Sequence, residues 1–143
     1  MENNNQFTRK ILVCCGPGCL AAGGKEVYES LKEIIEKNRA EITIEALLKG
    51  TGCHGLCEQG PIVRFMPEDI TYYRVKLSDL EEIFKQTVLR QKVVERLLFK
   101  DPATGQRVRS QGENSFYKKQ MKVALRNTGI IDPLQVDDYL ECG

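Results

Sequence analysis

The alternation of apolar and polar positions along the chain predicts a small sheet. Short apolar runs rich in β-branched residues occupy positions 10–13, 41–48 and 62–66, and such runs favour strands. A turn at 67–69 separates the third run from a fourth at 70–75, so the last two strands are expected to form a hairpin. The aromatic residues Phe65, Tyr72, Tyr73 and Phe84 are expected in the core.

Two other segments follow the period of a helix instead. In residues 24–37 and 77–89, apolar residues recur at intervals of three and four, which gives each segment one apolar face. Asn38 is placed to end the first helix, and Ser78 and Asp79 are placed to cap the second. The predicted order is β-α-β-β-β-α, an α/β (α+β) layer with one crossover. The apolar positions are Val27, Leu31, Ile34, Ile35, Leu77, Leu80, Phe84 and Val88.

The composition changes at Arg90, after which the chain becomes basic and less regular. A turn is expected at 101–105, and the spacing of Tyr117, Met121, Ala124 and Leu125 predicts a helix that stops at 127–129. A turn at Asp132 then opens a short helix at 134–140. This segment is too short for a core of its own, so it must pack on the first domain, on a partner or on missing sequence. Its basic run is either a solvated face or a docking surface for an acidic partner. The basic residues are Lys92, Arg96, Lys100, Arg107, Arg109, Lys118, Lys119, Lys122 and Arg126.

Composition excludes several functional classes. A net charge of +1 implies no bulk attraction to nucleic acid or to a membrane surface. No apolar run approaches the roughly 20 residues of a membrane span, so no membrane insertion is expected. The polar N-terminus has no apolar segment typical of a secretory signal, so we expect a cytoplasmic protein. Six cysteines in such a compartment are more often metal ligands or redox groups than disulfides.

Four of the six cysteines form two spaced pairs on glycine-rich loops, separated by 33 residues. Four thiolates suit a soft metal centre and are the ligands of an iron–sulfur cluster. Structural zinc and thiol–disulfide chemistry are the alternatives, although the chain has no C-x-x-C. Glycines beside the cysteines let the backbone fold tightly and direct amides at sulfur. The pairs are Cys14 with Cys19 (C-x4-C) and Cys53 with Cys57 (C-x3-C), supported by Gly16, Gly18, Gly52 and Gly55.

Four neighbouring features are left open by the sequence. Cys15 is either a bystander or a replacement ligand when Cys14 is lost, and Cys142 is expected to be a free thiol. His54 is the only histidine, which excludes a Rieske centre with its two histidine ligands. It is a lone ligand, a neighbour that modulates the cluster, or a solvated loop residue. The Gly-Pro step at 60–61 either closes the cluster loop or forms a generic turn.

The amino-acid sequence around the cysteines resembles that of a known family. The sequences ILVCCGPGC at 11–19 and TGCHGLCEQGP at 51–61 resemble the thioredoxin-like 2Fe-2S ferredoxin family. Within that family they are similar to the N-terminal domain of the NADH-binding flavoprotein subunit of multimeric hydrogenases and related NADH dehydrogenases. The sequences FYKKQ at 116–120 and LRNTGIIDP at 125–133 resemble the segment that leads into the flavin domain of that subunit.

The resemblance implies a thioredoxin-like domain at 9–90, after a flexible leader at 1–8 and before a linker at 91–143. It implies a 2Fe-2S cluster on the four cysteines, one-electron transfer and no catalytic pocket. The parent protein would be an NAD(P)H-dependent oxidoreductase, with FMN, NAD(H) and a 4Fe-4S cluster in a downstream domain that this chain lacks. Expected partners are a hydrogenase catalytic subunit or a small ferredoxin-like subunit, and relatives of this fold also form homodimers. The rival hypotheses are a thiol–disulfide protein and a non-catalytic assembly module with zinc or no metal.

Overall fold

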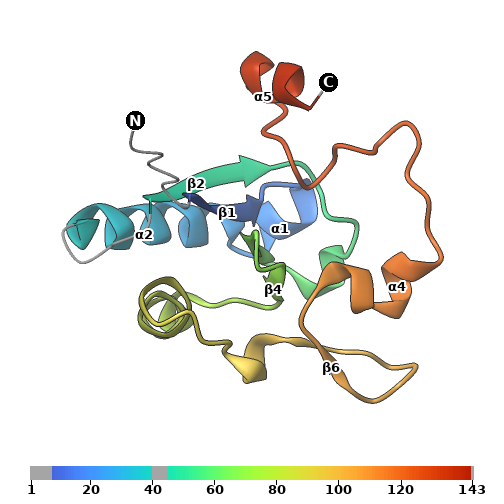
Figure 1. The fold of residues 1–143 in the computed structure, drawn as a ribbon, viewed down its shortest axis with the longest axis horizontal. Coiled ribbons are helices and arrows are strands. Elements are labelled where there is room, and N and C mark those ends of the chain that lie inside the picture. The colour runs from blue at the N-terminus through green and yellow to red at the C-terminus, as the bar shows by residue number, and fades with distance from the viewer. Residues whose placement is uncertain (1–7, 40–44, 143) are drawn as a thin grey trace, which may run out of the picture.

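A four-stranded sheet forms the centre of the protein in a computed structural model that describes residues 8–39 and 45–142 (Figure 1). The sheet has the order β2–β1–β3–β4, with β1 parallel to β2, antiparallel to β3, and β3 antiparallel to β4. All four predicted strands are confirmed, although the second continues to Thr51 and the fourth ends at Tyr72. Residues 41–44 of the expected second strand lie outside the described residues. The strands are β1 (Thr8–Cys14), β2 (Glu45–Thr51), β3 (Val63–Met66) and β4 (Ile70–Tyr72).

Two helical segments pack with the sheet, as predicted. The first is α2 (Gly24–Lys37), and Asn38 ends it as the C-cap. The second begins with a 3-10 turn, η3 (Leu77–Asp79), continues as α3 (Leu80–Ile83) and ends in a π-helical turn, η4 (Phe84–Leu89). The carboxylate of Asp79 accepts a hydrogen bond from the backbone N–H of Lys76 at 2.9 Å, so Asp79 takes part in capping as predicted. Ser78 lies inside η3, and Lys76 is the N-cap residue in its place.

The core lies where these helices meet one face of the sheet. Alternate residues of β1, Ile11 and Val13, are fully buried there, as the period of a strand requires. They pack with Leu31 and the other buried positions of α2. The four aromatic residues predicted for the core are all buried, and they are Phe65, Tyr72, Tyr73 and Phe84.

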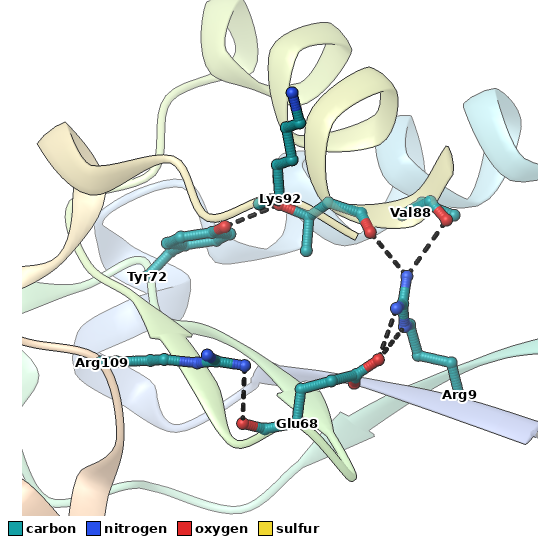
Figure 2. A network of polar contacts seen from close by, with 7 residues as sticks. Arg9, Glu68, Tyr72, Val88, Lys92 and Arg109 are labelled. Carbon is teal, nitrogen blue, oxygen red and sulfur yellow. Dashed lines mark hydrogen bonds and ion pairs between the residues drawn. The ribbon is translucent and has the colours of Figure 1, made fainter. Parts of the chain in front are cut away.

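The same face of β1 carries a buried arginine. Arg9 is 1% exposed, and its guanidinium pairs with the carboxylate of Glu68 (Figure 2). Its Nη1 also donates to the backbone carbonyls of Thr87 at 2.6 Å and Val88 at 3.1 Å. The last carbonyls of a helix have no partner inside it, and a cation is favoured at that end. Arg9 therefore caps η4 from the sheet.

A second polar contact fixes the chain that follows the helix. The hydroxyl of Tyr72 lies 2.6 Å from Thr87 Oγ1, which donates to the carbonyl of Lys92 at 3.0 Å (Figure 2). The backbone N–H of Val94 donates to the same tyrosine hydroxyl at 3.0 Å. Val94, Leu97 and Leu98 are buried with the core. The chain just after Arg90 therefore packs on the core formed by the sheet and its helices, one of the three expected alternatives.

Beyond the core, the segment is built from short elements. The expected turn at 101–105 joins two short strands, and Gly105 donates to the carbonyl of Asp101 at 2.7 Å. The expected last helix is present, and Asp138 in it pairs with Lys49 of β2 at 2.6 Å. No helix in the described ranges has the length and apolar composition needed to cross a bilayer. The elements are β5 (Phe99–Lys100), β6 (Arg107–Val108), α4 (Ser115–Lys118) and α5 (Val136–Glu141).

The helix predicted from the spacing of Tyr117, Met121, Ala124 and Leu125 is wrong. Helix α4 ends at Lys118, and a run of turns forms further along, at residues 124–130. Met121 and Leu125 are 87% and 66% exposed, so the expected apolar face has no surface to pack on. Short helices depend on such packing, which explains why this one does not continue.

Candidate metal centre

The four paired cysteines meet at one end of the sheet. Strands β1 and β2 are parallel, and Cys14 lies beside Thr51 in their register, so the loops that follow them leave the same edge. The first loop enters a short helix, α1 (Pro17–Ala21), which carries Cys19 and replaces part of the loop expected from the sequence. The second loop carries Cys53 and ends in a 3-10 turn, η2 (Cys57–Gln59).

The thiols contact one another as two linked pairs. Cys14 interacts with the thiols of Cys19 and Cys53, which shift its pKa, and its Sγ lies 3.8 Å from the carbonyl oxygen of Gly52. Cys53 Sγ lies 3.5 Å from Cys57 Sγ and accepts a hydrogen bond from the Gly55 N–H at 3.2 Å. Among the described residues, no three His, Cys, Asp or Glu side chains surround a single point as ligands of one metal ion. The arrangement is a set of two pairs, which matches a two-iron cluster in which each iron takes two protein ligands.

The thiol pKa values follow from these contacts. The hydrogen bond with Cys19 lowers the pKa of Cys14 to about 6 in spite of burial, and the backbone N–H groups of Gly16 and His54 contribute in the same direction. The pKa of Cys19 is raised, because it is the hydrogen-bonded partner of Cys14 and because it is buried. Burial also raises the pKa of Cys53. The site thus already favours one thiolate, the form that binds metal.

Glycines allow the two loops to approach this closely. A Cβ added at Gly16 would lie 2.8 Å from Cys53 Cβ, and one added at Gly18 would lie 2.7 Å from Cys57 Cβ. A Cβ at Gly60 would lie 2.6 Å from Cys19 Sγ, so the step at 60–61 closes against the cysteine loop instead of forming a generic turn. These three positions have room for hydrogen only.

Replacing Gly16 with alanine is expected to separate the two loops. The new methyl group would contact both Cβ and Cα of Cys53, and backbone cannot move aside as a side-chain end does. Gly16 has an ordinary extended conformation (φ −65°, ψ 156°), so the effect is steric alone. We expect a loss of about 1–3 kcal/mol in the free energy of unfolding, measured by urea denaturation followed by circular dichroism. Gly112→Ala is the control, because its nearest neighbour would be 3.9 Å away. Equal stability of the two variants would contradict the close approach.

His54 is buried, not solvated, and both its ring nitrogens have partners. The side chain is 1% exposed, and burial lowers its pKa to about 4, so the ring is neutral near pH 7. Gln111 Nε2 lies 2.8 Å from Nδ1, and Thr51 Oγ1 lies 3.0 Å from Nε2. The hypothesis of a solvated loop residue is wrong, and the ring has no free nitrogen for a metal. His54 is a neighbour of the cysteines, held by hydrogen bonds.

The other two cysteines lie apart from this set. Cys15 Sγ faces the carbonyl of Val13 at 3.6 Å and the Cα side of Gly50, where an added Cβ would lie 2.9 Å from it. The side chain therefore points away from the four paired thiols, and Cys15 is placed as a bystander. Cys142 is an exposed free thiol at the end of α5.

Cys57 is the one exposed thiol of the four paired cysteines, and a groove lies next to it. The groove has a volume of about 730 Å³. One wall is the second cysteine loop with Leu56, and the other is the C-terminal segment with Phe99, Phe116 and Lys119. The site is therefore exposed on this side, beside a surface that is mostly apolar.

Sequence reasoning missed three residues that support the second loop. Thr51 ends β2 and contacts the ring of His54. Gln111 and Tyr117 reach the same histidine from positions 57 and 63 residues further along the chain. Thr51 could have been noticed beside Gly52, but no spacing rule points from the C-terminal segment to His54.

Comparison with known proteins finds relatives of the part of the chain that carries the four paired cysteines. A family described as "Thioredoxin-like [2Fe-2S] ferredoxin" matches residues 3–88. The 2Fe-2S ferredoxin of Clostridium pasteurianum is 35% identical over 79 residues, which are 55% of this chain and 76% of that protein. The 2Fe-2S ferredoxin of Aquifex aeolicus is 30% identical over 80 residues, or 56% and 71% of the two chains. The crystal structure of a thioredoxin-like [2Fe-2S] ferredoxin from Aquifex aeolicus has a TM-score of 0.59 and 27% identity, covering 64% of this chain and 95% of its own.

Proposed function

Because this chain belongs to the thioredoxin-like [2Fe-2S] ferredoxin family, we propose that it carries single electrons on a 2Fe-2S cluster held by four cysteines. The family match and the similar solved structure confirm the expected thioredoxin-like 2Fe-2S ferredoxin family and its α/β fold. The observation that carries the proposal is the meeting of two thiol pairs at the end of two parallel strands. The proposed ligands are Cys14, Cys19, Cys53 and Cys57.

The chemistry of the site fits such a cluster. Four thiolates supply its protein ligands, and the cluster when bound accepts and releases one electron. The Gly55 N–H donates to Cys53 Sγ, and the N–H groups of Gly16 and His54 face Cys14. Such donors stabilise negative charge on sulfur and so favour the reduced state. Burial of Cys14 and Cys19 limits access of water from the side of the sheet.

We propose that electrons enter and leave the cluster on the side of Cys57. Its exposure brings the site to the surface, and the adjoining groove gives a partner an apolar surface beside it. One acidic and one basic side chain, Glu58 and Lys119, line the groove, so its charge does not by itself favour an acidic or a basic partner. The docking partner proposed from the resemblance is another subunit of a redox complex, such as a hydrogenase catalytic subunit or a small ferredoxin-like subunit.

The finer proposal is that the domain belongs to the NADH-binding flavoprotein subunit of a hydrogenase or NADH dehydrogenase, in the cytoplasm. It is supported by the sequences at 116–120 and 125–133, which lie beyond the family match at 3–88. The first of these runs beside the cluster loop, because Tyr117 donates to the carbonyl of His54 at 2.8 Å. The division of the chain near residue 90 stays a prediction.

A redox titration followed by EPR tests the one-electron function. We expect the signal of the reduced protein to follow a Nernst curve for one electron and to reverse fully on reoxidation. Protein that gives no EPR signal at any potential, and whose Cys53 and Cys57 thiols titrate by thiol labelling as a two-electron disulfide couple, would instead establish thiol–disulfide chemistry.

The flavoprotein proposal is tested in the native host. An antibody raised against this chain is used to isolate the protein that contains it under anaerobic conditions. We expect acid-releasable FMN in the isolated material and reduction of the 2Fe-2S signal by NADH or NADPH. Material without flavin, with a cluster that neither nucleotide reduces, would overturn this finer proposal and leave the electron carrier intact.

A further inference from the structure

The C-terminal segment holds the peptide that joins His54 to Gly55. The hydroxyl of Tyr117 donates to the carbonyl oxygen of His54 at 2.8 Å. The N–H of the same peptide belongs to Gly55 and donates to Cys53 Sγ at 3.2 Å. A peptide unit is planar, and its carbonyl and N–H point in opposite directions. The bond from Tyr117 therefore sets the direction in which the Gly55 N–H points.

The side chain of His54 is held by the same segment. Gln111 Nε2 donates to Nδ1, which leaves the Nε2–H to face Thr51 Oγ1 at 3.0 Å. Further along the chain, Gly129 packs against the imidazole ring of His54, where an added Cβ would lie 3.1 Å from Nδ1. Gly129 has φ +83°, a conformation that suits glycine. His54 is therefore enclosed between the second cysteine loop and residues that lie beyond the family match.

We propose that Gln111 and Tyr117 are positioning residues for the cluster, which tune its reduction potential by fixing the His54–Gly55 peptide against Cys53. This inference rests on the proposed function and assigns a role to the C-terminal segment. A donor to the carbonyl of a peptide also polarises its N–H, so the bond from Tyr117 strengthens the bond to sulfur. Hydrogen bonds to cluster sulfurs set the potential, and each one stabilises the more negative, reduced state.

The test compares Tyr117→Phe with wild type in anaerobically purified protein. The substitution removes one oxygen atom and keeps the ring. We expect a lower midpoint potential, equivalent to a roughly fivefold smaller equilibrium constant for reduction, the effect of about one hydrogen bond. Gln111→Leu is expected to lower the potential in the same direction. Tyr139→Phe and Gln120→Leu are matched controls at exposed positions of the same segment, and both are expected to keep the wild-type potential.

The outcomes separate this inference from the proposed function. Iron content and melting temperature are measured on every variant. A lowered midpoint potential is therefore accepted only for proteins that are folded and contain the cluster. Wild-type protein without a 2Fe-2S cluster would overturn the proposed function itself. Loaded Tyr117→Phe and Gln111→Leu proteins with the wild-type potential would overturn only the positioning role. If Tyr117→Phe or Gln111→Leu fails to fold, the midpoint potential of the other variant tests the positioning role.

Discussion

Replacing Cys14 with alanine is expected to abolish the cluster, because alanine, unlike serine, offers no oxygen atom to take the place of the sulfur. Iron should fall from about two atoms per chain to a small fraction of that value, because four thiolates are needed to hold both irons. The neighbouring Cys15 is not expected to take over. Its Sγ lies toward the carbonyl of Val13 and toward Gly50, whereas Cys14 contacts the thiols of Cys19 and Cys53. Reaching the cluster would require β1 to turn over at its last residue.

Iron analysis of the purified variants checks this expectation. Cys15→Ala and Cys142→Ala serve as controls, since both are cysteine-to-alanine changes outside the proposed ligand set, and both are expected to keep full iron. Cys14→Ala protein that retains its iron would contradict the assignment. Loss of that iron in the double variant at positions 14 and 15 would then identify Cys15 as a ligand.

Replacing Arg9 with methionine is expected to cause the largest loss of stability. The guanidinium satisfies two carbonyls at the end of η4 and pairs with Glu68, and it is 1% exposed (Figure 2). Methionine fills the space but leaves the carbonyls and a carboxylate without their partner. Glu68 Oε2 already lacks a hydrogen bond among the described residues. Removing one member of a buried ion pair costs about 3–5 kcal/mol, and urea denaturation measures it.

Two further variants separate the ion pair from the rest of the network. Arg90→Met is the matched control, because Arg90 is exposed at the end of the same helix, and it is expected to change stability by less than about 0.5 kcal/mol. The double variant Arg9→Met with Glu68→Leu is expected to recover part of the loss, since it removes the unpaired carboxylate. Arg9→Met protein as stable as the control would show that the buried network does not support the fold.

Local patterns were sufficient to predict the central elements. The helical period of Val27, Leu31 and Ile35 predicted α2 with its observed ends, because those side chains must face the core together. The two cysteine pairs predicted a shared site through residue type and number, since four thiolates suit one cluster. The parallel pairing of β1 and β2, which brings the two loops to the same end of the sheet, is seen only in the structure.

Other features depend on contacts that no local pattern contains. In the sequence, Arg9 at an inward position of β1 looks only like a polar residue that interrupts a strand. The partners that explain its burial lie 59 to 79 residues further along the chain. The helix expected around Met121 failed because the apolar spacing was present but no surface lies beneath it. Gln111 and Tyr117 contact His54 because residues 93–98 first anchor the segment to the core. The support of the cluster loop is therefore a tertiary property.

The central claim, a 2Fe-2S cluster on the four paired cysteines, is tested most directly on anaerobically purified protein. Iron and acid-labile sulfide are measured, and EPR spectra are recorded before and after reduction with dithionite. We predict about two irons and two sulfides per chain, with no signal as isolated and a rhombic signal after reduction. Protein that contains zinc or no metal, and that gives no signal on reduction, would contradict the claim.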